Sequence, residues 1–379
     1  MRIVFAALPA YGHLYPMMPI ALACQQAGHD VLVATGPPFL DRLPLPTVPG
    51  SPLTSTIDGL VAETRRRHPE AAGFELGMTM FADVSAEHVV PAIIAVGERF
   101  RPNVVVFEAM NTGAGVAASV LGVPAAAFAI GLAPSAYAML HTLTVDYQKG
   151  MWLERGLAVP TKALLADALL SPVPHSLAPD DAGLGAPTIP IRTVAYSDPG
   201  AVVAEWLTEP RDRPRVYVTL GTVSFGAVEV LRRTLDDLAG VDLDVLVSVG
   251  PEGDPSALGQ LGERVRAERF VAQSRVLPLV DLVVHHGGTG TVLGALEAGV
   301  PQLLLPQGAD QFRNAELIPK VGAGRALRND AQVPGAIAEE VVAMLGDSPE
   351  AATARRISAE IAAMPGPDEV VADLLALAR

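Results

Sequence analysis

The sequence predicts an α/β protein made of two Rossmann-like doubly wound domains that face a cleft. Short, continuously apolar strands alternate with helical segments in the first third of the chain. The same alternation resumes at Arg215, after a turn-rich connector. At 379 residues the chain is long enough for two domains.

The strand segments of the first domain are RIVFAAL, DVLVAT, NVVVFE and VPAAAFA. Helical sequence lies between them, such as YPMMPIALACQQAG, which ends on Gly28, and a helix expected at Ala86–Phe100. Continuous apolar strands are typical of a parallel sheet that helices cover on both faces. Residues 131–200 show no clean strand and include the connector SPVPHSLAPDDAGLGAPTIP.

The second domain repeats the pattern with RVYVTLGT, LDVLVSVG, ERFVA, VDLVVHH and PQLLLP. We expect domains at residues 1–200 and 201–364. Residues 365–379 follow a Pro-Gly-Pro break and are expected to form a helix that packs back on the first domain. Open α/β sheets bind ligands at the carboxyl ends of their strands, so the candidate residues are sought there.

Composition excludes several classes of function. A net charge of −14 argues against binding nucleic acid or an anionic membrane. Pro9, Gly12 and Pro16 interrupt the apolar N-terminus, which favours a strand, a turn and a helix over a signal peptide. No apolar run is long enough to predict a membrane span, so the cytoplasm is expected. The single cysteine, Cys24, is expected to be a buried structural thiol.

The stretch HHGGTGTVLGALEAGVPQLLLPQGADQF, residues 285–312, predicts a strand, a glycine turn and a helix. The first turn of a helix offers unpaired N–H groups and a dipole that favours an anion. Gly288 and Gly290 let the backbone approach such an anion, Thr291 adds a hydroxyl, and His286 adds a donor. A tight connection with no ligand is the alternative. The adjacent His285 is expected to point to the opposite face.

Three further features are expected in the same region. A second Gly-Thr turn, Gly221 and Thr222, follows the first strand of the second domain. Phe270 offers either an aromatic face to a nucleobase or ordinary core packing. Asp310 and Gln311 form a carboxylate–amide pair suited to sugar hydroxyls, although Asp at a helix start is as often an N-cap.

His13 and Glu108 are the candidate catalytic pair. His13 follows the first strand and Glu108 ends NVVVFE, so both are expected at the carboxyl edge of the first sheet. A histidine titrates near neutrality and suits proton abstraction, and a carboxylate on its other nitrogen fixes the tautomer. A structural turn histidine is the alternative for His13.

The long stretch from HHGGTGT to DQFRNAE, with GH after the first strand, resembles the inverting two-domain glycosyltransferases of the GT-B fold that act on natural products. It is similar to the bacterial enzymes that attach deoxysugars to antibiotics, including the calicheamicin glycosyltransferases. The resemblance spans essentially the whole chain and is strongest at residues 215–316. It implies metal-independent transfer of a (deoxy)sugar to a hydroxyl of a large apolar aglycone, with no cofactor beyond the nucleotide sugar.

The resemblance also implies residue roles. His13 and Glu108 would be catalytic, although the family usually has Asp where this chain has Glu. The implied donor-binding residues are Gly221, Thr222, Phe270, Val271, His286, Gly288, Gly290, Thr291, Asp310 and Gln311. The turn would hold the pyrophosphate, Phe270 and Val271 the base, and the Asp-Gln pair the sugar. Plant relatives carry Trp and Asn where this chain has Thr289 and Gly290, which favours a TDP-linked donor over a UDP-linked one.

The acceptor is expected in the first domain. Residues 74–88 and 136–152 are rich in Met, Phe, Tyr and Trp, which suits a large apolar acceptor or plain core packing. The DLD sequence at 242–244 precedes a strand and is expected to be a solvated turn rather than a metal site. Two other functions stay open, a non-catalytic nucleotide-sugar-binding partner and a nucleotide-sugar epimerase of the same fold. A homodimer is compatible with each.

Overall fold

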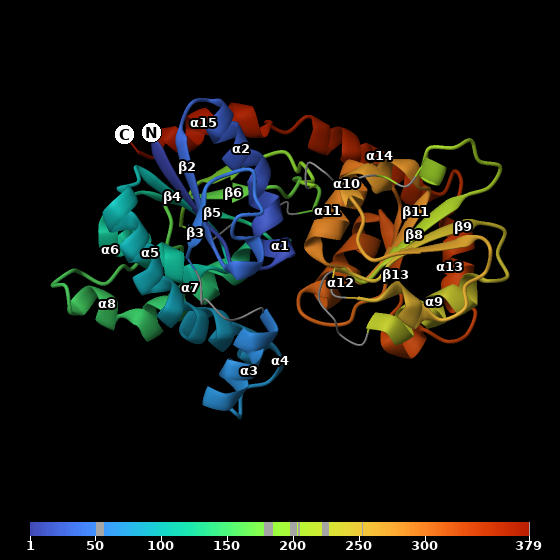
Figure 1. The fold of residues 1–379 in the computed structure, drawn as a ribbon, viewed down its shortest axis with the longest axis horizontal. Coiled ribbons are helices and arrows are strands. Elements are labelled where there is room, and N and C mark those ends of the chain that lie inside the picture. The colour runs from blue at the N-terminus through green and yellow to red at the C-terminus, as the bar shows by residue number, and fades with distance from the viewer. Residues whose placement is uncertain are drawn as a thin grey trace. The chain divides into compact units, whose positions relative to one another are not determined.

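The structure, a computed structural model, describes residues 1–50, 57–177, 185–197, 203, 205–221, 227–251 and 253–378. The chain forms two compact α/β units (Figure 1). The first comprises Met1–Arg192 together with Met364–Arg379, and the second comprises Thr193–Ala363. The predicted fold class is confirmed, because each unit is built on one sheet of parallel strands with helices between them.

In the described residues, the sheet of the first unit has seven parallel strands in the order β3-β2-β1-β4-β5-β6-β7. They are β1 (Arg2–Ala6), β2 (Asp30–Thr35), β3 (Thr47–Pro49), β4 (Val104–Glu108), β5 (Ala125–Phe128), β6 (Ala168–Ser171) and β7 (Thr188–Pro190). The strand order reverses between β1 and β4. In a doubly wound sheet, such a reversal opens the crevice in which ligands bind.

The expectation that residues 131–200 hold no clean strand is wrong, since β6 and β7 both lie there. A strand, β3, also lies in the Pro-rich stretch after DVLVAT, where no strand is expected from the sequence. These strands have only three or four residues, too few to show a period. The two edge strands, β3 and β7, each end in a proline, which an edge tolerates because one of its sides has no ladder to complete.

The helices of the first unit are α1 (Tyr11–Leu14), α2 (Met18–Gln26), α3 (Ile57–Arg67), α4 (Gly73–Thr79), the π-helix η3 (Met80–Ser85), α5 (Ala86–Phe100), α6 (Thr112–Leu121), α7 (Pro134–Gln148), α8 (Gly150–Leu153) and α15 (Pro367–Ala376). The last of them returns to the first unit and packs beside α2 (Figure 1). On α2, burial raises the pKa of the Cys24 thiol to about 12, so this thiol is an inert part of the core.

The run Gly73–Phe100, formed by α4, η3 and α5, has the length and composition of a membrane-crossing helix. However, 61% of its apolar window is buried within the protein. Helix α5 packs closely on α6, where a Cβ on Gly113 would come within 2.9 Å of the Ala86 Cα atom. This run is therefore packed in the manner of a core helix.

In the described residues, the sheet of the second unit has six parallel strands in the order β10-β9-β8-β11-β12-β13. They are β8 (Arg215–Thr219), β9 (Asp244–Ser248), β10 (Val265–Glu268), β11 (Leu282–His285), β12 (Gln302–Leu304) and β13 (Gly324–Ala326). Its helices are α9 (Ala227–Leu238), α10 (Gln273–Val276), α11 (Thr289–Glu297), α12 (Gln311–Val321), α13 (Ala336–Met344) and α14 (Pro349–Ala362). Here the strand order reverses between β8 and β11.

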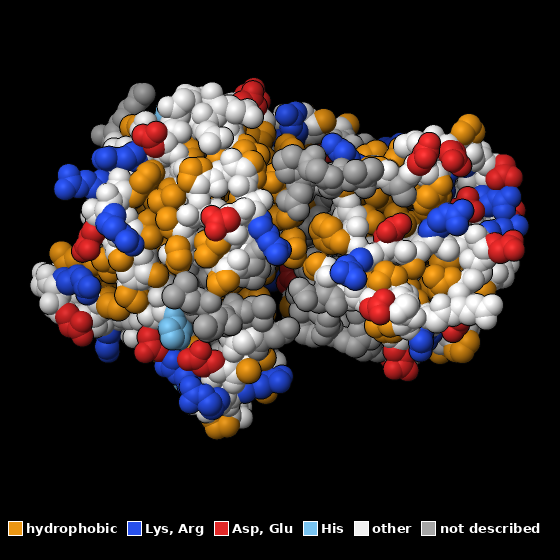
Figure 2. Space-filling view, in the orientation of Figure 1, with side chains coloured by type: hydrophobic (Ala, Val, Ile, Leu, Met, Phe, Trp, Pro, Cys, Tyr) orange, Lys and Arg blue, Asp and Glu red, His pale blue; other side chains and the backbone are white. Residues whose placement is uncertain are grey.

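Charged side chains of both signs are interspersed over the face drawn in Figure 2. Within the second unit, for example, the exposed Asp242 lies against Arg264 and Arg213. The mixture of signs leaves no single-signed field on this face, although the chain as a whole is acidic.

Candidate functional site

The switch point of the first sheet holds His13 and Glu108. Glu108 is the last residue of β4, and His13 lies in the short helix α1, which begins soon after β1 ends. The His13 Nδ1 atom is 2.9 Å from the Glu108 Oε1 atom. The structure therefore brings together the two residues that the sequence singles out as a catalytic pair.

The Glu108 carboxylate is fully buried and held by three donors. Besides His13, the Leu8 N–H donates to Oε1 at 3.4 Å and the Met110 N–H donates to Oε2 at 2.8 Å. Hydrogen bonds of this kind offset the cost of removing a carboxylate from water. Because a carboxylate only accepts, Nδ1 of His13 carries the proton in this contact, and Nε2 remains as the basic nitrogen.

A phenylalanine that the sequence analysis does not single out packs against the histidine. The Phe81 ring centroid lies 5.9 Å from that of His13, with the planes tilted by 35°. Phe81 belongs to the π-helix, and its carbonyl accepts a hydrogen bond of 3.2 Å from the Thr112 hydroxyl. π-helical turns often occur at functional sites, but no residue pattern in this stretch predicts one.

His141 supports the backbone just beyond the same strand end. It is fully buried on α7, its Nε2 atom donates to the Ala109 carbonyl at 2.8 Å, and its Nδ1 atom accepts from the Leu165 N–H at 2.8 Å. Burial lowers the pKa of His141 to about 4, so the ring stays neutral. Residues 136–152 are expected either to bind an apolar acceptor or to pack in the core. His141 packs in the core, next to Ala109, the residue that follows Glu108.

On the second unit, the connections after β8 and β11 meet around His286. A Cβ atom on Gly221 would lie 2.5 Å from Cε1 of the His286 ring, and one on Gly288 would collide with Nε2. Both positions therefore need glycine because the imidazole occupies the space. The expected partner Thr222 lies outside the described residues.

The His286 ring is neutral and retains hydrogen-bonding capacity. Burial lowers its pKa to about 4. Its Nδ1 atom is buried and has no hydrogen-bond partner among the described residues. A neutral imidazole can donate one N–H, and His286 immediately precedes the glycine turn that leads into α11. The ring is thus placed beside backbone N–H groups that could receive an anion.

His285 has a separate role in the same turn. It is fully buried, its Nε2 atom donates to the Gln302 Oε1 atom at 2.9 Å, and its Nδ1 atom accepts from the Gly287 N–H at 3.1 Å. Burial, with a smaller contribution from the neighbouring His286, lowers the pKa of His285 to about 3. Gly287 has a φ of +90°, a conformation that glycine adopts without strain. His285 therefore fixes the geometry of the glycine turn.

Asp310 and Gln311 meet the turn differently. The exposed Asp310 accepts a hydrogen bond of 2.8 Å at Oδ2 from the Thr289 hydroxyl. Asp310 occupies the N-cap position of α12, as the alternative expected, but its side chain makes no capping hydrogen bond. Gln311 is buried, and its Oε1 atom accepts from the N–H groups of Gln307 and Gly308 at 2.7 and 3.0 Å.

Asn314, which the sequence analysis overlooks, joins these parts. Its amide lies within hydrogen-bond distance of the Gly287 carbonyl, the Thr289 hydroxyl and the Asp310 carboxylate. One signal could have found it, since residues four apart on a helix share a face and Asn314 is four residues after Asp310.

The remaining candidates are less tightly placed. Phe270 follows β10 by two residues and is 43% exposed, so the alternative of core packing is wrong for its ring. Val271 packs at the edge of the apolar core of the second unit. Thr291 is buried in the first turn of α11, where its hydroxyl accepts from the Gln273 side chain at 3.3 Å, while Gly290 is exposed.

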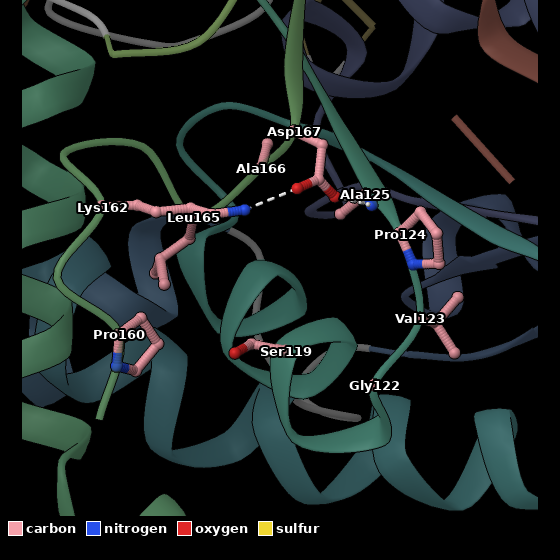
Figure 3. A pocket seen from close by; sticks show the side chains of 10 residues that line it. All are labelled: Ser119, Gly122, Val123, Pro124, Ala125, Pro160, Lys162, Leu165, Ala166 and Asp167. Carbon is pink, nitrogen blue, oxygen red and sulfur yellow. Dashed lines mark hydrogen bonds and ion pairs between the residues drawn. The ribbon is translucent and has the colours of Figure 1, made fainter. Parts of the chain in front are cut away.

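A hollow of about 280 Å³ lies where strands β5 and β6 of the first sheet begin (Figure 3). Asp167, just before β6, forms an ion pair of 2.5 Å with Lys162 and accepts from the Ala125 N–H at 3.0 Å. Because these residues begin strands rather than end them, the hollow lies away from His13.

Among the described residues, no group of three or more His, Cys, Asp or Glu side chains is arranged to hold a metal ion.

Comparison with known proteins identifies relatives along the whole chain. The model described as "Erythromycin biosynthesis protein CIII-like, N-terminal domain" matches residues 22–221, and the C-terminal domain of the same description matches residues 232–377. The L-demethylnoviosyl transferase of Streptomyces niveus is 33% identical over 390 residues and covers 100% of this chain and 99% of its own.

Solved structures agree with these sequence relatives. The glycosyltransferase SnogD from Streptomyces nogalater superposes with a TM-score of 0.81 at 28% identity, covering 100% of this chain and 99% of its own. A spinosyn rhamnosyltransferase superposes with a TM-score of 0.83 at 27% identity, covering 99% of this chain and 100% of its own. The latter enzyme has also been solved with thymidine diphosphate and with the spinosyn aglycone.

Proposed function

The chain belongs to the erythromycin biosynthesis protein CIII-like family, and on this premise we propose that its two units bind the two substrates of one sugar transfer. It is a glycosyltransferase with the GT-B fold. Its activity is the transfer of a sugar to a natural-product aglycone. We also propose which donor the enzyme uses, which anomeric configuration it forms, and which residues bind the donor and catalyse the transfer.

For the donor, we propose a TDP-linked deoxysugar held by the second unit. Thymidine diphosphate has been seen bound to the spinosyn rhamnosyltransferase, which matches nearly all of this chain. Here the pyrophosphate would meet the N–H groups at the start of α11 and the neutral ring of His286. The exposed Phe270 would stack on the thymine, and Asp310 would accept from a sugar hydroxyl.

The observation that carries the proposed mechanism is the 2.9 Å contact between His13 and Glu108. Nε2 of His13 would remove the proton from an acceptor hydroxyl as the oxygen attacks the anomeric carbon. The buried Glu108 carboxylate would stabilise the imidazolium that forms. Attack on the face opposite the departing TDP inverts the configuration at that carbon.

The departing TDP would be stabilised by groups of this chain rather than by a metal ion. The positive end of the α11 dipole, the N–H groups of the glycine turn and His286 all favour the negative charge that develops on the leaving oxygen. We therefore propose that the reaction is metal-independent and needs no further cofactor.

The buried carboxylate also favours this function over the two alternatives. Burying a carboxylate against a histidine costs free energy. A protein that only bound nucleotide sugars would gain nothing from that arrangement. An epimerase would need acid and base groups around the sugar itself, and Asp310 is the one such residue proposed here. The acceptor we propose is a large apolar aglycone bound by the first unit, in the cytoplasm.

The direct test is to incubate the protein with a panel of TDP-sugars, with and without an aglycone panel, and to follow TDP release in the presence of EDTA. We expect release that depends on an aglycone and persists with EDTA, and a product of inverted anomeric configuration. Tight TDP-sugar binding without turnover would support the non-catalytic partner. Conversion of the TDP-sugar without an aglycone would support the epimerase.

A further inference from the structure

Asn314 occupies an unusual position in the donor region of the second unit. It lies in the first turn of α12 with a side chain only 1% exposed. Its Nδ2 atom is 2.8 Å from the Gly287 carbonyl oxygen, 3.1 Å from the Thr289 hydroxyl and 3.3 Å from the Asp310 Oδ2 atom. A single buried amide thus reaches the glycine turn, the start of α11 and the start of α12.

The geometry forms a closed set of hydrogen bonds. The Thr289 hydroxyl donates to Asp310 Oδ2 at 2.8 Å, so Thr289, Asp310 and Asn314 all contact one another. Two amide hydrogens serve three acceptors, and the shortest contact is to the Gly287 carbonyl. Since a buried polar group left without a partner is costly, these residues hold one another in a single arrangement.

The backbone before Asp310 is held in a costly conformation. Ala309 has a φ of +52°, in the left-handed region that residues other than glycine rarely adopt. The Oε1 atom of Gln311 accepts from the two N–H groups at 307 and 308 and so fixes the loop on that side. Asn314 and Thr289 fix Asp310 on the other side. Strain of this kind persists where the surroundings over-determine a local geometry.

We propose that Asn314 is a positioning residue that couples the two parts of the donor site. It sets the turn that would hold the pyrophosphate, through the Gly287 carbonyl, and it sets the carboxylate that would hold the sugar, through Asp310 Oδ2. Asn314 itself touches neither part of the donor. The inference rests on the proposed donor site and adds that its phosphate and sugar ends are one unit.

The effect of Asp310→Ala on TDP binding distinguishes coupling through Asn314 from simple structural support. Thymidine diphosphate lacks the transferred sugar that Asp310 would bind, so Asp310→Ala would leave TDP binding unchanged if the two parts were independent. If Asn314 couples them, Asp310→Ala loosens the turn and weakens TDP binding as well. The effects of Asp310→Ala and Asn314→Ala would then overlap rather than multiply.

The test is a double-mutant cycle with TDP as the probe, measured by calorimetry on the full chain. We expect Asn314→Ala to weaken TDP binding about tenfold and Asp310→Ala about threefold, with the double variant well short of the thirtyfold product. Asn314→Leu, which keeps a similar volume and adds no charge but loses the amide hydrogens, repeats the cycle in case the alanine variant unfolds. TDP binding unchanged by either Asn314 variant, or effects that multiply fully, would overturn the inference.

A matched control comes from the same unit. Gln332 is buried and its side-chain amide donates to the Leu327 carbonyl at 2.9 Å, outside this set of hydrogen bonds. Gln332→Ala should lower the melting temperature and leave TDP affinity within about twofold of wild type. Failure of the wild-type protein to bind TDP would overturn the proposed donor site itself. That outcome is distinct from a wild type that binds TDP and is insensitive to Asn314.

Discussion

At the scale of the residue, the site depends on histidines that differ in what holds them. His13 is partly exposed and paired with a carboxylate, which suits a group that gains and loses a proton. His141 and His285 are fully buried and His286 is half-buried, and burial lowers the pKa of each. These three rings are held neutral, and their hydrogen bonds or packing position the backbone around them.

Because these histidines are buried in the neutral form, the protein should lose stability in mild acid. For His141 the pKa is about 4 in the folded protein against 6.5 for a free side chain. Above pH 6.5 neither state takes up the proton, so the full stability is present. As the pH falls from 6.5 towards 4, the unfolded chain binds a proton that the folded chain does not. His141 alone would then lower the free energy of unfolding by about 2 kcal/mol at pH 5.

Urea unfolding of the wild type and of His141→Gln at pH 7.5, 6.0 and 5.0 would measure this effect. The variant should be the less stable protein at pH 7.5, because it disturbs the bonds to Ala109 and Leu165. Its stability should nevertheless fall less steeply as the pH is lowered. Parallel pH profiles for the two proteins would contradict the assignment of His141 as a buried neutral ring.

At the scale of the element, two strand-to-helix connections form the proposed donor region. The connection after β8 contributes Gly221 and the connection after β11 contributes the turn at 286–288. Neither is a binding site alone, since the His286 ring from one connection fills the space left by the missing Cβ in the other.

Gly221→Ala and Gly288→Ala should therefore displace the His286 ring. At Gly221 the new Cβ would lie 2.5 Å from the ring, and the φ of +80° would also be strained for alanine. We expect each variant to weaken TDP binding by about tenfold or more, measured by calorimetry. Gly240→Ala is the control, because a Cβ there meets nothing within 4 Å and the backbone is not left-handed. TDP affinity equal to that of the control would show that His286 needs no such space.

The sequence predicted the strands that share a continuous apolar pattern, and it missed the features that have no sequence pattern. The segments of β1, β2, β4, β8 and β11 are continuously apolar, so their strands and the residues at their ends could be placed. The π-helix carrying Phe81 has no pattern that separates it from α-helix. Asn314 was missed because its importance lies in contacts with Gly287 and Thr289, more than twenty residues away in the sequence.

At the scale of the whole molecule, the chain folds as two units, and the first of them is not contiguous in sequence. Residues 364–379 rejoin the first unit, where α15 packs beside α2. The inward face of α15 includes the buried residues Val370, Val371 and Leu374. The C-terminal helix is thus part of the unit that carries His13. The residues that most resemble the glycosyltransferases, 215–316, lie in the second unit instead.

Removal of residues 365–379 should destabilise the first unit by on the order of 5 kcal/mol, from the loss of these three apolar side chains. Hydrogen exchange should then quicken at α2, while α11 and α12 stay protected. TDP binding, which we assign to the second unit, should survive the truncation. Faster exchange in α12, with exchange in α2 unchanged, would show that α15 supports the second unit instead and would contradict this prediction.

The most direct measurement of the central claim is the rate of aglycone-dependent TDP release by His13→Ala relative to wild type. The account predicts a fall of about 100- to 10,000-fold, because the variant lacks the group that removes the acceptor proton. TDP affinity and melting temperature should stay close to the wild-type values, since His13 lies in the other unit from the proposed donor site. A folded His13→Ala protein that releases TDP at a rate within a few-fold of wild type would contradict the account.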